Sequence, residues 1–246
     1  DRSPSRGLGD VYKRQVLASG HACRVKPSSK DTVLIGYVVD LLRAIDPAIP
    51  LRMAEQGERP DAVIATGSDN ANRYFRMLFG GIPSLLRGSR QSVAVLSGRE
   101  TAAELSGLEE DIFAYSGLGC RNVSLLFLPR GYMPELRCTA LNEKYRRNYL
   151  RERALLRMRR MPFVDLDGAV LCEDRSFPAA LSRIHYTFYD SLADVEAWLA
   201  AHDDRLQCVV SQCVRHSRRV AFGRAQHPGL TDYADDVDTM RFLGTI

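Results

Sequence analysis

Cys120 is the residue of this chain whose setting most favours covalent chemistry. Gly117 and Gly119 precede it, and the apolar run Val123–Leu128 follows it. Glycines let the backbone approach a substrate closely and expose its N–H groups, while Arg121 adds positive charge that favours a thiolate. Cys120 is therefore a candidate nucleophile, and Gly119 and Cys120 are candidate oxyanion donors. From these residues alone, a buried and inert cysteine before a core strand stays open as the alternative.

Two upstream segments each close an apolar stretch at a point where a strand could pass into a helix. They are Lys26-Pro27-Ser28-Ser29 and Thr66-Gly67-Ser68. A helix that begins directly after such a turn presents backbone N–H groups to an anion such as phosphate. Together with Cys120, the two segments indicate thiol chemistry that depends on a cofactor.

Composition narrows the class of protein. The chain has 246 residues, of which 45% are hydrophobic, and a net charge of +4. Residues 1–15 contribute four basic and two acidic groups, and the remaining charge of about +2 is too mild for a nucleic-acid-binding surface. Its six cysteines are scattered and do not form the dense framework of a small secreted domain. No apolar run approaches the length of a membrane span, and no secretory signal begins the chain. We expect a cytoplasmic globular protein with its cysteines as thiols.

Loss of apolar periodicity and a segment rich in glycine and proline predict the domain boundaries. Residues 1–15 show no periodicity and look like translated sequencing-adapter read-through, so we expect a non-native or disordered tail and a chain that is truncated at its N-terminus. Gly80-Gly81-Ile82-Pro83 marks the main boundary. We therefore expect a partial cofactor-binding domain over 16–83 and a catalytic domain over 84–213. A last segment, over 214–246, should return to the first domain or contact another subunit.

Apolar periodicity predicts an α/β fold with a parallel sheet. In the first part we expect helices over 31–45 and 66–79 and strands over 16–25, near 51 and over 61–65, the last buried on both faces. In the second part we expect helices over 100–115, 134–160 and 192–201 and strands over 92–96, 123–128, 169–172, 184–188 and 208–211.

The order of these signals resembles the aldehyde dehydrogenase superfamily, and more closely the acyl-CoA reductases related to the fatty acid reductase of bacterial luminescence. The resemblance extends over nearly all of 16–246. It is carried by the two cofactor segments and the cysteine turn in that order, and by the following stretches: Ala62-Val63-Ile64-Ala65-Thr66-Gly67-Ser68, Glu110-Asp111-Ile112-Phe113 and Asp232-Tyr233-Ala234-Asp235. It implies a partial Rossmann-like cofactor domain beside an α/β catalytic domain.

The resemblance also implies roles for single residues. Cys120 matches the nucleophile that attacks an acyl thioester, expels coenzyme A and holds the acyl group until a reduced nicotinamide converts it to an aldehyde. Lys26 matches the lysine on the adenosine ribose, and Ser68, after Thr66-Gly67, matches the serine on the diphosphate. Ser29 stands where many relatives have a glutamate that holds both ribose hydroxyls. A small neutral residue leaves room for a 2′-phosphate, so NADPH is expected, with NADH as the alternative.

Two departures from the superfamily pattern bear on direction and activity. Aldehyde-oxidising members carry a glutamate base in a segment that corresponds here to Leu85-Leu86-Arg87-Gly88-Ser89, which has no carboxylate. A reductase has no use for hydrolysis of its acyl-enzyme, so this absence favours reduction of an acyl-CoA over aldehyde oxidation. The asparagine that completes the oxyanion hole lies, by the resemblance, upstream of Val16. Oxidative aldehyde dehydrogenase activity and a catalytically inactive acyl-binding fragment are the alternatives, and the full-length protein is expected to be a homo-oligomer.

Two other groups of residues could suggest a metal site or nucleic-acid binding, but simpler structural interpretations account for them. Cys208, Cys213 and His216 lack a fourth ligand and a Cys-x-x-Cys pair, so we expect no metal site. The basic segment Lys144–Arg160 interleaves tyrosines and leucines with its charges, which is typical of an amphipathic helix with a solvated face. We therefore expect no nucleic-acid partner.

Overall fold

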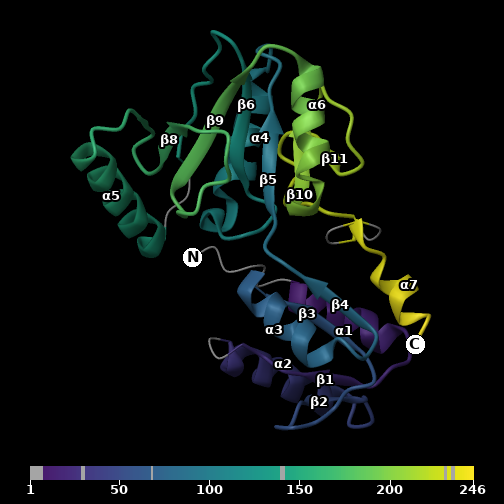
Figure 1. The fold of residues 1–246 in the computed structure, drawn as a ribbon. Coiled ribbons are helices and arrows are strands. Elements are labelled where there is room, and N and C mark those ends of the chain that lie inside the picture. The colour runs from purple at the N-terminus through teal and green to yellow at the C-terminus, as the bar shows by residue number, and fades with distance from the viewer. Residues whose placement is uncertain (1–7, 29–30, 68, 139–141, 230–231, 234–235) are drawn as a thin grey trace. The chain divides into compact units, whose positions relative to one another are not determined.

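The computed structural model describes residues 8–28, 31–67, 69–138, 142–229, 232–233 and 236–246. The chain forms two compact units (Figure 1). Among the described residues, the larger unit spans residues 89–236, and the smaller unit combines residues 8–88 with residues 237–246. The chain thus leaves the smaller unit after Gly88 and returns to it at Val237.

The larger unit is built on a seven-stranded sheet with the order β11-β10-β5-β6-β9-β8-β7. Its strands are β5 (Gln91–Val95), β6 (Val123–Pro129), β7 (Val164–Asp165), β8 (Val170–Glu173), β9 (Arg183–Tyr189), β10 (Leu206–Ser211) and β11 (Arg219–Val220). All neighbouring strands run parallel except β7 and β8. The expected α/β class with a parallel sheet is confirmed.

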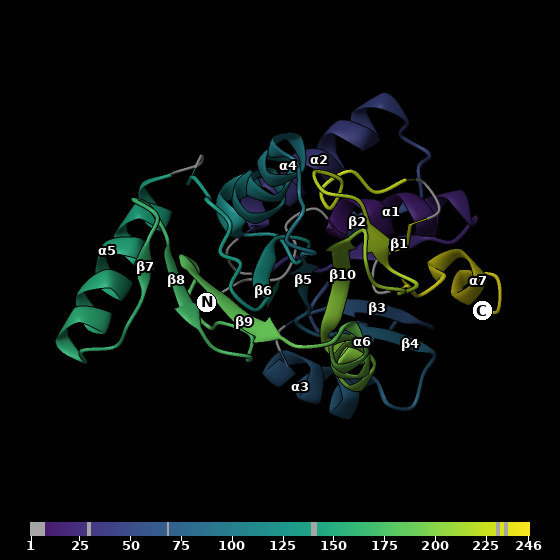
Figure 2. The ribbon, with the colours of Figure 1, turned by 90° about the horizontal axis from the view of Figure 1, so that it is seen from above.

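Helices cover both faces of this sheet (Figure 2). Helix α4 (Ala102–Phe113) packs Leu108 and Ile112 into one core cluster, and α6 (Leu192–Ala201) packs Val195 and Leu199 into the cluster on the opposite face. Strand β6 is buried over nearly its whole length, because an unbroken apolar strand between two helix layers supplies side chains to both clusters. The turns η1 (Ala114–Gly117) and η2 (Asp203–Arg205) follow α4 and α6.

Helix α5 (Glu143–Met158) is shorter than the helix expected over 134–160. It begins at Glu143 because the side chain of Asn142 caps it, accepting a hydrogen bond from the backbone N–H of Tyr145 at 2.9 Å. Tyr145, Tyr149 and Leu156 are buried, which is the amphipathic arrangement that the basic segment predicts.

The smaller unit contains two separate two-stranded parallel sheets. Its elements are α1 (Leu8–Ala18), β1 (Cys23–Val25), α2 (Thr32–Ile45), β2 (Leu51–Met53), β3 (Val63–Thr66), α3 (Asp69–Phe79), β4 (Ser84–Arg87) and α7 (Thr239–Leu243). Strand β1 pairs with β2, and β3 pairs with β4. Arg87 joins the returning segment to this unit, donating hydrogen bonds to Val237 O at 3.3 Å and to Thr239 Oγ1 at 3.1 Å.

Three expectations for the smaller unit are wrong. Residues 8–15, expected to lie outside the fold, form most of α1, and the strand expected over 16–25 is limited to β1. The reason is helical spacing: Tyr12 is buried, and Val16 and Leu17 pack against a core made by Cys23, Val39 and Leu51. The stretch over 84–87, assigned no strand, forms β4.

Apolar side chains of the smaller unit are more exposed than their pattern suggests. In α2 the one fully buried side chain is Val39, whereas Val33 and Ile45 are 86% and 73% exposed. Strand β3, expected to be buried on both faces, is half-buried, since within the described residues it pairs with β4 alone. No helix in the described part of the chain has the length and apolar character that crossing a membrane requires.

Candidate functional site

Cys120 lies in the turn between η1 and β6, at the amino end of β6, and its side chain is half-buried. The buried end of α4 and the buried start of β6 fix the two sides of this turn. Beneath it, Ser92 Oγ donates a hydrogen bond to the backbone carbonyl of Cys120 at 2.9 Å. The candidate nucleophile is thus held by backbone contacts while its side chain keeps some access to solvent.

Three successive residues before the cysteine adopt the left-handed conformation. Tyr115, Ser116 and Gly117 have φ angles of 52°, 57° and 64°. A residue with a side chain pays about 1–2 kcal/mol in this region, whereas glycine enters it freely. Backbone strain of this kind is concentrated at functional sites, where the surrounding structure maintains it. The sequence indicates flexibility at Gly117, but nothing in it marks Tyr115 or Ser116.

Asn122 is the centre of the turn. Its Oδ1 accepts the N–H of Gly119 at 2.7 Å, and its Nδ2 donates to the carbonyls of Asp111, Ile112 and Ala114 at 3.1, 3.2 and 3.0 Å. The side chain is 1% exposed. The last carbonyls of a helix have no hydrogen-bond donor within the helix. The Asn122 amide supplies such a donor at the end of α4. The role of Asn122 was not predicted from the sequence. The available signal was an amide side chain seven positions after the helix expected over 100–115.

The network around Asn122 changes the expectation for Gly119. Its N–H, a candidate oxyanion donor from the sequence, is already donated to Asn122 Oδ1. A Cβ on Gly119 would also lie 3.0 Å from that oxygen. Gly119 therefore shapes the turn and permits the close approach of Asn122, and its N–H is engaged within the turn.

The other buried thiols are poor nucleophiles. Burial raises the pKa of Cys208 to about 11, and its Sγ lies 3.0 Å from Ser92 Oγ. Burial likewise raises the pKa of Cys23 and the pKa of Cys172. A thiol is reactive as its thiolate, so these three cysteines are core residues.

Asp111, near the end of α4, is a fully buried carboxylate that fixes a distant segment to the cysteine turn. Its Oδ2 accepts the N–H of Gly223 at 2.7 Å, and its Oδ1 accepts the N–H of Ala225 at 2.9 Å. Arg121, expected to lend positive charge to the thiolate, donates through Nη1 to the carbonyl of Ala225 at 3.4 Å. Gly107 allows this packing, because a Cβ there would lie 2.8 Å from Gly223 N. The segment 223–226 is thereby held against α4 and the turn.

Asp111 gives stability a specific pH dependence. Burial raises its pKa from 3.8 to about 6, against the lowering effect of the two N–H bonds, with smaller contributions from Glu110, which raises it, and His227, which lowers it. The folded protein therefore binds this proton more tightly than the unfolded chain does. The contribution of this group to the free energy of unfolding is largest below about pH 4 and is lost as the pH rises through about 6.

We expect this loss to be about 3 kcal/mol, from the size of the pKa shift. It is measured as the difference in free energy of unfolding between the wild type and Asp111→Asn, obtained by urea titration at several pH values. The asparagine does not titrate, so subtraction removes the contributions of other groups. A difference that is constant between about pH 4 and pH 7 would contradict the assignment.

Gly117 provides a second test of the turn. A Cβ at this position would meet Tyr145 Cε2 at 3.3 Å, in addition to the cost of a φ of +64°. We expect Gly117→Ala to lower the free energy of unfolding by about 2–3 kcal/mol, and Gly131→Ala by about 1 kcal/mol. Gly131 is the matched control, because its φ is +78° and nothing lies within 4 Å of its Cβ position. Equal losses in urea unfolding would show that the contact with Tyr145 carries no cost.

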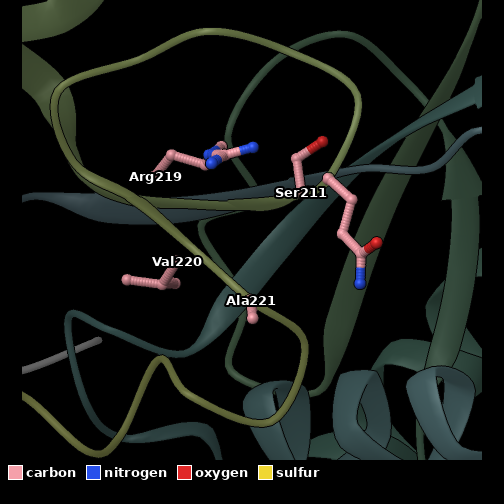
Figure 3. Close-up of a pocket in the computed structure, with 5 residues that line it drawn as sticks. Ser211, Arg219, Val220 and Ala221 are labelled. Atoms are coloured by element: carbon pink, nitrogen blue, oxygen red, sulfur yellow. The ribbon is translucent and has the colours of Figure 1, made fainter.

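A cavity of about 290 Å³ lies elsewhere in the larger unit (Figure 3). It is lined by Ser211, Gln212, Arg219, Val220 and Ala221, at the carboxyl ends of β10 and β11. Ser211 Oγ bonds the carbonyl of Val95, at the end of β5, whereas the cysteine turn bonds Ser92 near its beginning. Three residues of strand separate the two places by about 10 Å. The cavity is therefore distinct from the cysteine turn.

The candidate cofactor residues belong to the smaller unit. Thr66 ends β3, and Gly67 forms the turn into α3, with its N–H donated to Arg87 O at 3.0 Å. A Cβ on Gly67 would lie 2.7 Å from Ala71 Cβ, so this turn requires glycine. Lys26 is exposed directly after β1, in the other sheet of the unit. Ser29 and Ser68 lie outside the described residues.

The residues considered as metal ligands make contacts with other side chains. Cys213 Sγ lies 3.4 Å from Ser211 Oγ, and His216 Nε2 lies 3.2 Å from Asp203 Oδ1. In the part of the chain that the structure describes, no group of three or more histidine, cysteine, aspartate or glutamate side chains is arranged to hold a metal ion.

Comparisons with known proteins agree on the architecture. No family model matches the chain, and no curated protein matches it significantly. Among solved structures, an aldehyde dehydrogenase of Mycobacterium tuberculosis in complex with NAD+ superimposes with a TM-score of 0.62, at 14% identity over 86% of this chain and 56% of that chain. The fold is that of aldehyde dehydrogenases.

Two further structures show the same likeness. The indole-3-acetaldehyde dehydrogenase AldA of P. syringae, in complex with NAD+ and IAA, gives a TM-score of 0.59 at 13% identity, over 86% of this chain and 54% of that chain. The substrate-bound AldH of Staphylococcus aureus gives 0.55 at 16% identity, over 83% and 54%. The chain thus spans a little more than half the length of these proteins, and the likeness establishes a common fold.

Proposed function

We propose that this protein reduces an acyl thioester, such as a long-chain acyl-CoA, to the aldehyde through a covalent intermediate on Cys120. The observation that carries the proposal is the cysteine turn. A half-buried thiol stands at the amino end of β6, on a turn fixed by Asn122 and preceded by left-handed residues, in a chain with the aldehyde dehydrogenase fold. The dehydrogenase neighbours support oxidoreductase chemistry.

Cys120 would act as the nucleophile. Its thiolate attacks the carbonyl carbon of the thioester, the carbon–sulfur bond to coenzyme A breaks, and the coenzyme leaves as a thiolate that takes up a proton. The acyl group is then held on Cys120 Sγ until hydride is added to the carbonyl carbon. Breakage of the bond to Cys120 releases the aldehyde and regenerates the cysteine thiolate. The fixed turn keeps Sγ in one place through these steps.

A nicotinamide cofactor fits the turn at Gly67. The structure packs the backbone of this residue against α3 more closely than a side chain would allow, which leaves the N-terminus of an eleven-residue helix directly after β3. Such a terminus attracts phosphate. Lys26, Ser29, Thr66, Gly67 and Ser68 are the residues that would hold the cofactor, and its reduced form would supply the hydride. The neutral Ser29 favours NADPH over NADH.

The surroundings of the turn support reduction over oxidation. Oxidation of an aldehyde ends with hydrolysis of the acyl-enzyme, which needs a carboxylate that can activate a water molecule. Asp111 is the buried carboxylate beside the turn, but both of its oxygens accept backbone N–H groups and its side chain is 0% exposed. It is therefore not available to a water molecule.

The proposal is tested by acylation. The protein is incubated with a long-chain acyl-CoA, and the acyl group is located by mass spectrometry of peptides. NADPH and then NADH are added to the acylated protein, and aldehyde formation is followed. We expect the label on Cys120 and aldehyde with NADPH. Labelling at another residue would reject the nucleophile, labelling without aldehyde would indicate an acyl-binding protein, and aldehyde consumption with NADP+ would favour the oxidative direction.

A further inference from the structure

Gln226 carries a buried polar group with no partner. Its Nε2 atom is buried and makes no hydrogen bond among the described residues. A buried amide N–H without a partner costs about 1–3 kcal/mol, and such groups are rare in folded proteins. The energy is recovered if a bound molecule supplies an acceptor, so the orphaned N–H indicates a ligand atom next to Gln226.

The position of Gln226 is set by the contacts just before it. Asp111 accepts the N–H groups of Gly223 and Ala225, and Arg121 donates to the carbonyl of Ala225. These bonds attach Gly223 and Ala225 to two places around the cysteine turn. Asp111 lies before the turn on α4, and Arg121 lies directly after Cys120. The side chain of Gln226 therefore starts from a fixed point, more than one hundred residues away from the turn in sequence.

The amide of Gln226 reaches the cysteine turn. A Cβ built on Gly119, the residue before Cys120, would lie 3.8 Å from Gln226 Oε1. The backbone N–H of Gly119 cannot serve a ligand here, because it is donated to Asn122 Oδ1 at 2.7 Å. The Gln226 amide thus lies against the residue before Cys120 through its Oε1, and its Nε2 makes no hydrogen bond within the described part of the chain.

We propose that Gln226 is a catalytic residue that donates a hydrogen bond from Nε2 to the carbonyl oxygen of the acyl group that Cys120 attacks. Attack converts this oxygen from a carbonyl to an oxyanion, and a donor already held in a water-poor site stabilises the developing charge without reorganisation. The inference rests on the proposed function, in that it requires an acyl group on Cys120. It adds a residue that acts on the oxygen while the cysteine acts on the carbon.

The test measures acyl transfer separately from thiol reactivity in the full chain. Acylation is followed as the burst of p-nitrophenolate from p-nitrophenyl acetate, which needs neither coenzyme A nor a cofactor. The reactivity of Cys120 itself is followed by alkylation with iodoacetamide, a reaction that forms no oxyanion. Gln226→Met preserves the length of the side chain and removes its N–H groups. Gln212→Met is the matched control, since Gln212 is an exposed glutamine of the same unit.

We expect Gln226→Met to slow the burst by about 100-fold or more, and to leave the alkylation rate within about twofold of the wild type. The melting temperature of Gln226→Met should be unchanged or higher, because an unpaired buried amide is removed. Gln212→Met should match the wild type in every measurement.

Three results would overturn the inference. An unchanged burst rate in Gln226→Met would show that the amide does not act on the acyl oxygen. Equal losses of burst and alkylation rates would show that Gln226 acts through the thiol or the fold. Absence of a burst from the wild type would remove both this inference and the acyl transfer on which it rests. A normal burst without reaction with any acyl-CoA would instead reject the proposed substrate and leave the role of Gln226 standing.

Discussion

Replacing Cys120 with serine should reduce NADPH-dependent aldehyde formation by at least about 10³-fold and abolish stable acylation by acyl-CoA. Serine preserves the size and the hydrogen-bonding capacity of the side chain, so the turn should keep its shape. Its hydroxyl, however, is far less ionised than a thiol at neutral pH. Loss of the thiolate therefore removes the reaction and leaves the fold.

Cys213→Ser is the matched control for this experiment. Cys213 is a second half-buried thiol of the larger unit, held near Ser211 Oγ at 3.4 Å in the part of the sheet opposite to the cysteine turn. We expect its rates of acylation and aldehyde formation to match those of the wild type. If Cys120→Ser retains the acyl label while Cys213→Ser loses it, the nucleophile is Cys213, and the assignment based on the turn is wrong.

Asn122→Asp should lower the free energy of unfolding by about 3–5 kcal/mol at neutral pH. The substitution replaces the side-chain NH2 group with an oxygen atom. It therefore removes the donor that bonds the carbonyls of Asp111, Ile112 and Ala114. A buried carboxylate would face those three carbonyl oxygens with no donor between them. Chemical denaturation measures the loss. Burial among carbonyl oxygens raises the pKa of the new carboxyl group in the folded protein, so the loss should diminish as the pH falls toward about 4 and be smallest below it.

The control for this substitution is Asn148→Asp. Asn148 is a half-buried residue of α5 that donates to the carbonyl of Lys144 at 2.8 Å, in a hydrogen bond exposed to solvent. Its change should alter the free energy of unfolding by no more than about 0.5 kcal/mol. If Asn122→Asp were equally mild, the turn would be held by the strands and helix alone, and Asn122 would not be its organising residue.

The two experiments separate chemistry from scaffolding within one short segment. Cys120→Ser should abolish the reaction and preserve stability, whereas Asn122→Asp should lower stability and, through the turn, the reaction as well. This distinction reflects how the segment is built. Its reactive atom is half-buried, and the groups that hold its backbone are inside the protein.

Local patterns determined much of the larger unit. Its α/β class, the helix over 192–201 and the core strand after Cys120 follow from apolar periodicity and chain punctuation, because each depends on neighbours within a few residues. The strand-to-helix turn at Gly67 follows for the same reason. The candidate nucleophile could also be chosen from the sequence, since a cysteine between glycines and a core strand is a local arrangement. Its chemical role stays a prediction.

Tertiary structure alone decided what surrounds that cysteine. The left-handed backbone at Tyr115 and Ser116 contradicts the intrinsic preferences of residues with side chains, so no local sequence pattern predicts it. Gln226 comes to the turn because the chain leaves the sheet after β11 and runs back along α4. There Asp111 accepts the N–H groups of Gly223 and Ala225, more than one hundred positions away in sequence. The sequence determined most elements of the larger unit. Contacts between segments distant in sequence, which no short stretch of sequence contains, decided which polar groups meet near Cys120.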